Sequence, residues 1–320
     1  MTAGPTTAPT TATPALSTPA IRTRGLRKVF GRTVAVSGVD LDVPAGAVLG
    51  VLGPNGSGKT TLIRMLLALS RPTEGTVELF GTPVPAAAGE VLAHIGALVE
   101  GPGFHPFLSG RENLRRCAAA EPLLPSSAVS EAVETALTRV GLETAASRRY
   151  RAYSLGMKQR LGLAAVLLVP RRLVILDEPT NGLDPAGTRE VRRIIAELHA
   201  GGATVLVSSH LLAEVEATCT HVAVLTEGAL IAEGPLAALL DSAAPALDVH
   251  TPDSAVAMRA LRAAGLRATV DPGGVRVELA GTDPPSVVAL LVGAGVAVHE
   301  VRRWKTGLDE LFAQLTEGSR

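Results

Sequence analysis

Residues 53–60 read GPNGSGKT and lie between a short apolar run, residues 48–52, and a segment in which Leu62, Ile63 and Leu66 recur at helical spacing. The glycines allow successive backbone N–H groups to wrap around phosphate oxygens, and the N-terminus of the following helix adds positive potential. A strand, a glycine-rich turn and a helix in this order predict a phosphate loop. We therefore expect an α/β domain that binds a nucleoside triphosphate.

Two side chains of this loop are expected to act on the phosphates directly. Lys59 would neutralise the β and γ oxygens, and the hydroxyl of Thr60 would bind Mg²⁺. The predicted nucleotide-binding residues of the loop are Gly53, Pro54, Asn55, Gly56, Ser57, Gly58, Lys59, Thr60 and Thr61.

Two adjacent carboxylates, Asp177 and Glu178, follow the apolar run of residues 173–176. Parallel sheets place their ligand crevice at the carboxyl ends of such buried strands. Asp177 is expected to hold Mg²⁺ through water, and Glu178, pointing to the opposite side, to polarise the attacking water as a general base. The alternative is a pair of acids on the surface without a catalytic role.

Residues 153–160, YSLGMKQR, lie between the phosphate loop and the acidic strand. Ser154, their second residue, stands at the expected start of a helix, where backbone N–H groups can bind an anion. A second phosphate-binding element of this kind indicates a site shared between two chains.

The order of these three segments resembles the ATPase subunits of ATP-binding cassette (ABC) transporters, over residues 21–240. The resemblance implies ATP and Mg²⁺ as ligands, and it implies that Ser154 and Gly156 contact the γ-phosphate bound by the other subunit. The family commonly has Leu-Ser-Gly-Gly-Gln at this point. Tyr153, Leu155 and Met157 replace its first leucine, its first glycine and its glutamine.

Other positions match the family in order. Phe30 stands where an aromatic ring stacks on adenine, with packing in the core as the alternative. The loop of residues 181–184 matches the segment that joins the two subunits, and its Asp184 is a further predicted nucleotide contact. His210 matches the histidine that senses the γ-phosphate and positions the catalytic water.

Glu100 stands where the family usually has a glutamine that reaches Mg²⁺ through water. Together with the GMKQR of residues 156–160, this glutamate resembles the bacitracin- and lantibiotic-type exporters, whose ATPases pair with a separately encoded permease. The resemblance makes Glu100 a metal and nucleotide ligand whose extra negative charge changes metal preference or resting activity. An incidental loop acid is the alternative.

The chain is expected to divide into three parts. Residues 1–20, rich in Thr, Pro and Ala, lack the pattern of a signal peptide and are predicted to be a disordered tail. Residues 21–241 would form the ATPase domain, with an antiparallel N-terminal sheet, a parallel-sheet core and a helical insertion at about residues 104–168. After a linker at residues 241–245, residues 246–320 would form a small α+β accessory domain of βαββαβ order, with its last strand at residues 296–301. A terminal helix would begin at a capping box formed by Thr306 and Asp309.

Composition narrows the function further. The chain has 320 residues, zero formal net charge and four lysines among its 30 basic residues, so a nucleic-acid partner is not favoured. Its two cysteines, Cys117 and Cys219, fit a reducing compartment. No apolar run approaches the ~20 residues of a membrane-spanning helix. The family resemblance therefore implies a peripheral location at the cytoplasmic face of the cell membrane.

The resulting hypothesis is an ATPase whose homodimer closes around two Mg-ATP and powers export of a hydrophobic or peptide antibiotic or drug through a separate membrane permease. One alternative is a soluble ABC ATPase that acts on ribosomes or DNA. Another is a sensor in which the accessory domain binds a small molecule, although bracing of the dimer or the ATPase domain is the favoured role for that domain.

Overall fold

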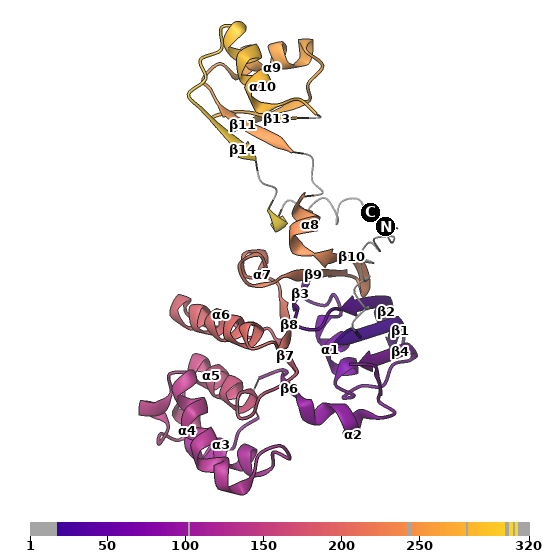
Figure 1. Ribbon diagram of the computed structural model, residues 1–320, viewed down its shortest axis with the longest axis vertical. Coiled ribbons are helices and arrows are strands. Elements are labelled where there is room, and N and C mark those ends of the chain that lie inside the picture. The colour runs from indigo at the N-terminus through magenta and orange to yellow at the C-terminus, as the bar shows by residue number, and fades with distance from the viewer. Residues whose placement is uncertain are drawn as a thin grey trace, which may run out of the picture.

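The computed structural model describes residues 18–101, 103–241, 245–279, 281–304, 307–309 and 311–312. Two sheets and a group of helices make up residues 18–241, and a third sheet with two helices follows (Figure 1). The α/β fold with an antiparallel N-terminal sheet, a parallel core and a helical insertion agrees with the prediction.

The central sheet has six strands in the order β10-β9-β3-β8-β7-β6. Their bounds are β3 Val48–Leu52, β6 Ile95–Leu98, β7 Leu173–Asp177, β8 Thr204–Ser209, β9 His221–Thr226 and β10 Ala229–Pro235. All neighbours pair in parallel except β10, which runs antiparallel to β9. The apolar runs of β3 and β7 are buried at every residue, because helices or a second sheet cover both faces.

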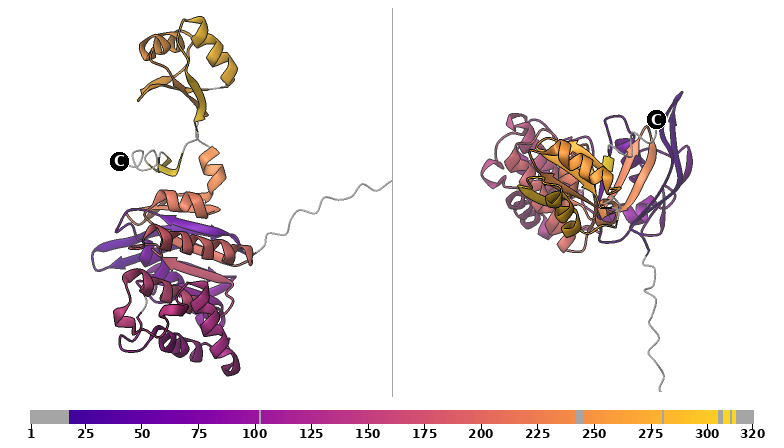
Figure 2. Two further views of the ribbon diagram at one scale, coloured as in Figure 1. Left: turned by 90° about the vertical axis from the view of Figure 1, so that its left-hand side faces the viewer. Right: turned by 90° about the horizontal axis from the view of Figure 1, so that it is seen from above.

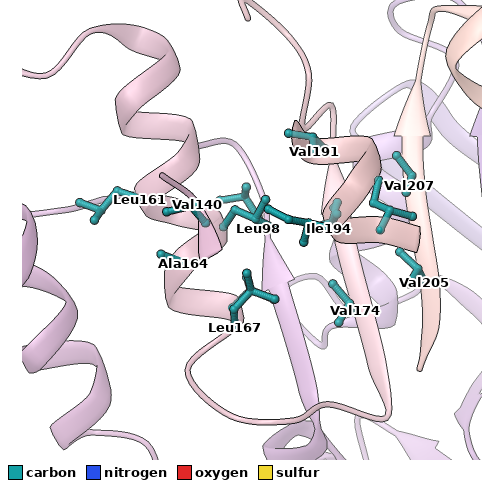
Figure 3. Close-up of a cluster of buried hydrophobic side chains, with 14 of the residues drawn as sticks. Leu98, Val140, Leu161, Ala164, Leu167, Val174, Val191, Ile194, Val205 and Val207 are labelled. Carbon is teal, nitrogen blue, oxygen red and sulfur yellow. The ribbon is translucent and has the colours of Figure 1, made fainter. Parts of the chain in front are cut away.

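Helices cover the two faces of this sheet separately. Helix α1, Lys59–Leu66, packs in one hydrophobic core, which also includes the inner side of the N-terminal sheet. Helices α5, Leu155–Val166, α6, Pro185–Ala200, and α7, Leu212–Thr218, pack in a second core on the opposite face. Figure 3 shows Leu98 of β6, Val174 of β7 and Ile194 of α6 within this second core.

The N-terminal sheet is antiparallel, in the order β2-β1-β4-β5. Its strands are β1 Ile21–Phe30, β2 Thr33–Val43, β4 Glu74–Leu79 and β5 Thr82–Val84. The predicted tail of residues 1–20 extends too far toward the sheet, because Ala20 is fully buried and continues β1 at its N-terminal end. Its N–H donates to the carbonyl of Val43, and its own carbonyl accepts from Phe80. Residues 1–17 lie outside the described part of the chain.

The helical insertion consists of α3, Gly110–Ala119, α4, Val129–Arg139, and α5. Helix α3 begins at a capping box: the N–H of Glu112 donates to the Ser109 hydroxyl, and the Glu112 carboxylate accepts from the Ser109 N–H at 2.7 Å. The short helix α2, Ala88–Val91, precedes the insertion, and α8, Leu236–Asp241, follows β10. Asp241 therefore ends a helix and does not begin the linker.

The C-terminal sheet has the order β12-β13-β11-β14, and all its pairs are antiparallel. Its elements are β11 Ala246–His250, α9 Ser254–Ala263, β12 Ala268–Asp271, β13 Gly274–Glu278, α10 Pro284–Gly293 and β14 Glu300–Trp304. They enclose their own core and lie at the end of the molecule opposite the helical insertion (Figure 2).

The predicted βαββαβ order is correct, but the last strand was placed too early. Gly295 is left-handed with φ 77°, and the N–H of Val296 returns to the carbonyl of Leu291. Residues 295 and 296 therefore terminate α10, and β14 begins only at Glu300. The predicted cap at Thr306 lies outside the described residues. Leu308, Leu311 and Phe312 pack on the helical core of residues 18–241.

Candidate functional site

The phosphate loop connects β3 to α1 and depends on glycine at two tight points. A Cβ on Gly53 would lie 2.3 Å from the carbonyl oxygen of Leu225, and one on Gly58 would lie 2.4 Å from that of Ala35. Gly58 also has φ 100°, a conformation that side chains rarely adopt. The loop therefore packs directly against neighbouring backbone, and this contact holds its shape.

Lys59 begins α1, and its side chain is only 6 % exposed. Its Nζ donates to the carbonyls of Gly53 at 2.8 Å and Pro54 at 3.2 Å, so the ammonium lies across the loop. The hydroxyl of Ser57 is buried with no hydrogen-bond partner in the described part of the chain. A buried positive charge beside an unused donor suits an anionic ligand rich in oxygen acceptors.

Thr60 and Asp177 bring two oxygen ligands together next to this charge. The Thr60 hydroxyl donates to Oδ2 of Asp177 at 2.9 Å, and the buried Ser208 hydroxyl donates to Oδ1 at 2.5 Å. No cluster of three or more His, Cys, Asp or Glu side chains suited to a metal occurs among the residues that the structure describes. This donor set fits Mg²⁺, which binds few protein oxygens and takes the rest from phosphate and water.

Glu178 turns away from Asp177 because its backbone is left-handed, with φ 48°. A non-glycine residue in this region costs about 1 kcal/mol or more, and such strain is concentrated at functional sites. The turn is held by the N–H of Glu178, which donates to the Ser208 hydroxyl at 2.9 Å. The carboxylate consequently lies 2.7 Å from Nδ1 of His210 and 3.5 Å from Nζ of Lys59.

These residues surround a cleft of about 400 Å³. Glu178 and His210 line this cleft from the ends of β7 and β8. The phosphate loop and the start of α1 contribute Asn55, Gly56, Gly58, Lys59, Thr60 and Thr61. The structure thus brings these eight residues, all predicted for ATP binding or hydrolysis, together around one cleft. Asp177, which is 7 % exposed, lies beneath them behind Thr60.

A second cleft of about 340 Å³ contains the other predicted phosphate contacts, Ser154, Gly156 and Asp184. The Ser154 hydroxyl accepts from the N–H of Met157 at 3.3 Å and caps α5, as the sequence pattern predicts. Asp184 caps α6 by accepting from the N–H of Gly187 at 2.8 Å. None of these three residues lines the first cleft.

Phe30 and Glu100 line neither cleft. The ring of Phe30 is 50 % exposed at the end of β1, with Nζ of Lys28 4.8 Å from its centre, so it does not pack in the core. Glu100 has a left-handed backbone, and its carboxylate forms an ion pair with Arg64 of α1, which raises the pKa of Arg64. In this structure the predicted metal ligand therefore engages a cation of the protein.

The structure adds residues that sequence reasoning did not identify. Ser208 connects Asp177 with the backbone of Glu178, and only its place opposite Asp177 in the paired strands could have indicated this role.

Tyr153 is buried against Gly110, where any side chain would meet the tyrosine ring, and the Tyr153 hydroxyl donates to the carbonyl of Ala145 at 2.8 Å. Burial also raises the pKa of Tyr153. A tyrosine is accommodated at this position because residue 110 is a glycine.

No helix in the described ranges is long and apolar enough to span a membrane.

Comparison with known sequences gives a consistent result. A family model described as ABC transporter matches residues 36–181. The bacitracin transport ATP-binding protein BcrA of Enterococcus faecalis is 35% identical over 296 residues, which cover 92% of this chain and 95% of that protein. BcrA of Bacillus licheniformis is 44% identical over 66% of this chain and 68% of its own length. The daunorubicin/doxorubicin resistance ATP-binding protein DrrA of Streptomyces peucetius is 37% identical over 91% of both chains.

Solved structures agree with these sequence matches. The cbiO1 protein of Clostridium perfringens, part of the ABC transporter complex cbiONQ, superposes with a TM-score of 0.62 at 26% identity and covers 70% of this chain and 91% of its own. A nucleotide-free ATP-binding cassette from an ABC transporter superposes with a TM-score of 0.60 at 26% identity, covering 68% of this chain and 91% of its own.

Proposed function

Because this chain belongs to the ATP-binding subunits of ABC transporters, and is therefore an ATPase, we propose that two copies of it close around two ATP molecules and that each copy completes the site of the other. Lys59, Thr60, Asp177, Glu178 and His210 of one copy would face Ser154 and Gly156 of its partner. The finer assignments below rest on this arrangement.

One observation carries the proposal: the predicted phosphate contacts of a single chain lie in two separate clefts. Helices α1 and α5, whose N-termini would both face phosphate, pack on opposite faces of the central sheet. Within one chain Ser154 therefore lies in a different cleft from the phosphates that Lys59 would bind. A second copy, turned about a twofold axis, can supply it to each site.

The chain's own residues account for the hydrolysis step. Backbone N–H groups of the phosphate loop and the Lys59 ammonium would stabilise the charge on the β and γ phosphates. Mg²⁺ held by Thr60 and Asp177 would add electrostatic stabilisation of the leaving oxygens. The Glu178 carboxylate would accept a proton from the attacking water, and His210, already hydrogen-bonded to it, would orient that carboxylate.

The transport assignment is export of a hydrophobic or peptide antibiotic or drug through a separately encoded membrane permease. It is supported by relatives whose names record bacitracin transport and daunorubicin/doxorubicin resistance. Attachment to such a permease would place the dimer peripherally at the cytoplasmic face of the cell membrane.

The decisive experiment compares the wild type with Glu178→Gln. The amide keeps the shape of Glu178 but cannot accept the proton, so ATP with Mg²⁺ should trap a stable dimer that light scattering after gel filtration detects. A Glu178→Gln chain that stays monomeric and hydrolyses ATP at the wild-type rate would refute the assignment.

The shared site is tested by mixing two inactive variants, Lys59→Ala and Ser154→Arg. A mixed dimer contains one site with both defects and one with neither, so the mixture should recover part of the ATPase activity that each variant lacks alone. Recovery would not occur if each chain worked independently.

Co-purification of the intact chain from membranes, followed by identification of an integral membrane partner, tests the proposed permease.

A further inference from the structure

We infer that Glu214 is a positioning residue for ATP hydrolysis, which holds the loop after Glu178 and the end of strand β8, just before His210, in one relative geometry. Glu214 lies in the first turn of α7, directly after the His210 loop, and it does not line the phosphate cleft. The inference rests on the proposed roles of Glu178 and His210.

The carboxylate of Glu214 joins the two loops through a single oxygen. The hydroxyl of Thr180, two residues after Glu178, donates to Oε2 of Glu214 at 2.6 Å. The hydroxyl of Ser209, immediately before His210, lies 3.5 Å from the same oxygen. Since the Ser209 hydroxyl also accepts from the N–H of Leu211 at 3.0 Å, the start of α7 and the His210 loop form one hydrogen-bonded unit.

Helix α7 is itself fixed to the central sheet, so Glu214 has a rigid base. The next residue, Val215, is 1 % exposed and packs over Gly50 of β3. A Cβ added to Gly50 would lie only 2.4 Å from Cγ1 of Val215. The cavity beside Glu214 has a volume of about 20 Å³ and is lined by Thr180, Arg192 and Ser209. It leaves room for about one water molecule.

The geometry that this link protects is the 2.7 Å contact between Glu178 and His210. Those two residues belong to loops at the ends of β7 and β8, and Ser208 restrains only the backbone side of Glu178. Through Glu214, Thr180 in the loop after Glu178 is connected to Ser209 at the end of β8. Loss of the carboxylate should therefore misplace the base relative to the water and lower kcat, while the KM for ATP stays near the wild-type value.

The test uses Glu214→Ala, Glu214→Gln, Thr180→Val and the double variant Thr180→Val with Glu214→Ala in the full chain. Glu214→Ala and Thr180→Val should each lower kcat about tenfold, as small misplacements of catalytic groups do, with little change in KM. The double variant should be no slower than the worse single variant, since both remove the same link. Glu214→Gln should recover much of the activity, because its amide oxygen can still accept from Thr180.

Glu216→Gln is the matched control, because Glu216 lies two residues on in α7, is exposed and contacts neither catalytic loop. Its kcat should stay at the wild-type value. Binding of a fluorescent ATP analogue and the thermal unfolding of each variant are measured in parallel. An unchanged kcat in Glu214→Ala, or additive losses in the double variant, would overturn the inference even if Glu178→Gln still traps a dimer.

Discussion

The Nδ1 atom of His210 lies 2.7 Å from Oε2 of Glu178, and the other oxygen of that carboxylate lies 3.5 Å from the ammonium of Lys59. The proposed general base is thus held between a histidine and the lysine that is expected to bind phosphate. Phosphate oxygens at the loop would compete for Lys59 and leave Glu178 oriented by His210 alone. We therefore expect His210 to matter more for the chemical step than for ATP binding.

Substitution of His210 by alanine should lower kcat by about 100-fold or more, the usual loss when a group that supports proton transfer is removed. Binding of ATP should remain, since the phosphate loop is unchanged. Phosphate release and equilibrium nucleotide binding check the two halves of this expectation. His199→Ala, at an exposed position near the end of α6, is the control and should behave as the wild type.

Asp177→Asn should raise the Mg²⁺ concentration that gives half-maximal ATPase activity by about tenfold or more, because it removes the negative charge next to Thr60. The amide oxygen can still accept from one of the two hydroxyls of Thr60 and Ser208, and the amide NH2 can donate to the other, so the fold should be retained. Chelation of Mg²⁺ should abolish hydrolysis in both forms. Asp309→Asn, an exposed acid outside the site, should leave the Mg²⁺ titration unchanged.

Arg64→Ala should lower the Mg²⁺ concentration needed for activity, because it releases Glu100 and removes a positive charge near Asp177. The ion pair is largely exposed, so the free energy of unfolding should change by less than about 1 kcal/mol. Combining Arg64→Ala with Glu100→Gln separates the two effects: the part due to Glu100 should disappear. If Arg64→Ala alone left the Mg²⁺ titration unchanged, Glu100 would have no part in metal binding.

Burial raises the pKa of the Cys219 thiol to about 12 and also raises that of the less buried Cys117. Only the thiolate reacts with disulfide reagents, so at pH 8 the native protein should label slowly at Cys117 and not at Cys219. Unfolding in guanidinium should expose both. The Cys117→Ser variant gives a single-thiol chain in which any rapid native labelling would show that Cys219 is accessible.

Leu308→Ala should destabilise the main body of the protein, because Leu308 is 1 % exposed and packs on its helical core although it follows the C-terminal sheet. Removal of a buried leucine side chain typically costs about 2 kcal/mol or more, which thermal unfolding detects. Leu69→Ala, at a leucine that is 68 % exposed, is the control. Dimer formation with ATP in the same variant tests whether the C-terminal segment braces the dimer.

Local patterns were sufficient wherever a short stretch of chain determines its own conformation. Steric limits fix the backbone of the glycines at residues 53–58. Hydrogen bonds within a few residues fix the helix caps at Ser154 and Asp184. The apolar run before Asp177 is likewise a local feature of the sequence. The phosphate loop, the acidic strand and the helix starts could therefore be predicted correctly. The last strand was misplaced because Gly295 and Val296 terminate a helix, which the β-branched valines near them conceal.

Contacts between distant segments could not be predicted in this way. The pairing of Glu100 with Arg64, of Tyr153 with Gly110 and of Glu214 with Thr180 depends on how helices and loops pack after the strands have paired. The separation of Ser154 from Lys59 was expected only from the order of the motifs and the family resemblance, since two helices with similar N-termini can pack on either face of a sheet. The residue types in the chain were enough to indicate ATP hydrolysis, whereas the packing of α1 and α5 on opposite faces is the observation from which we propose a second chain.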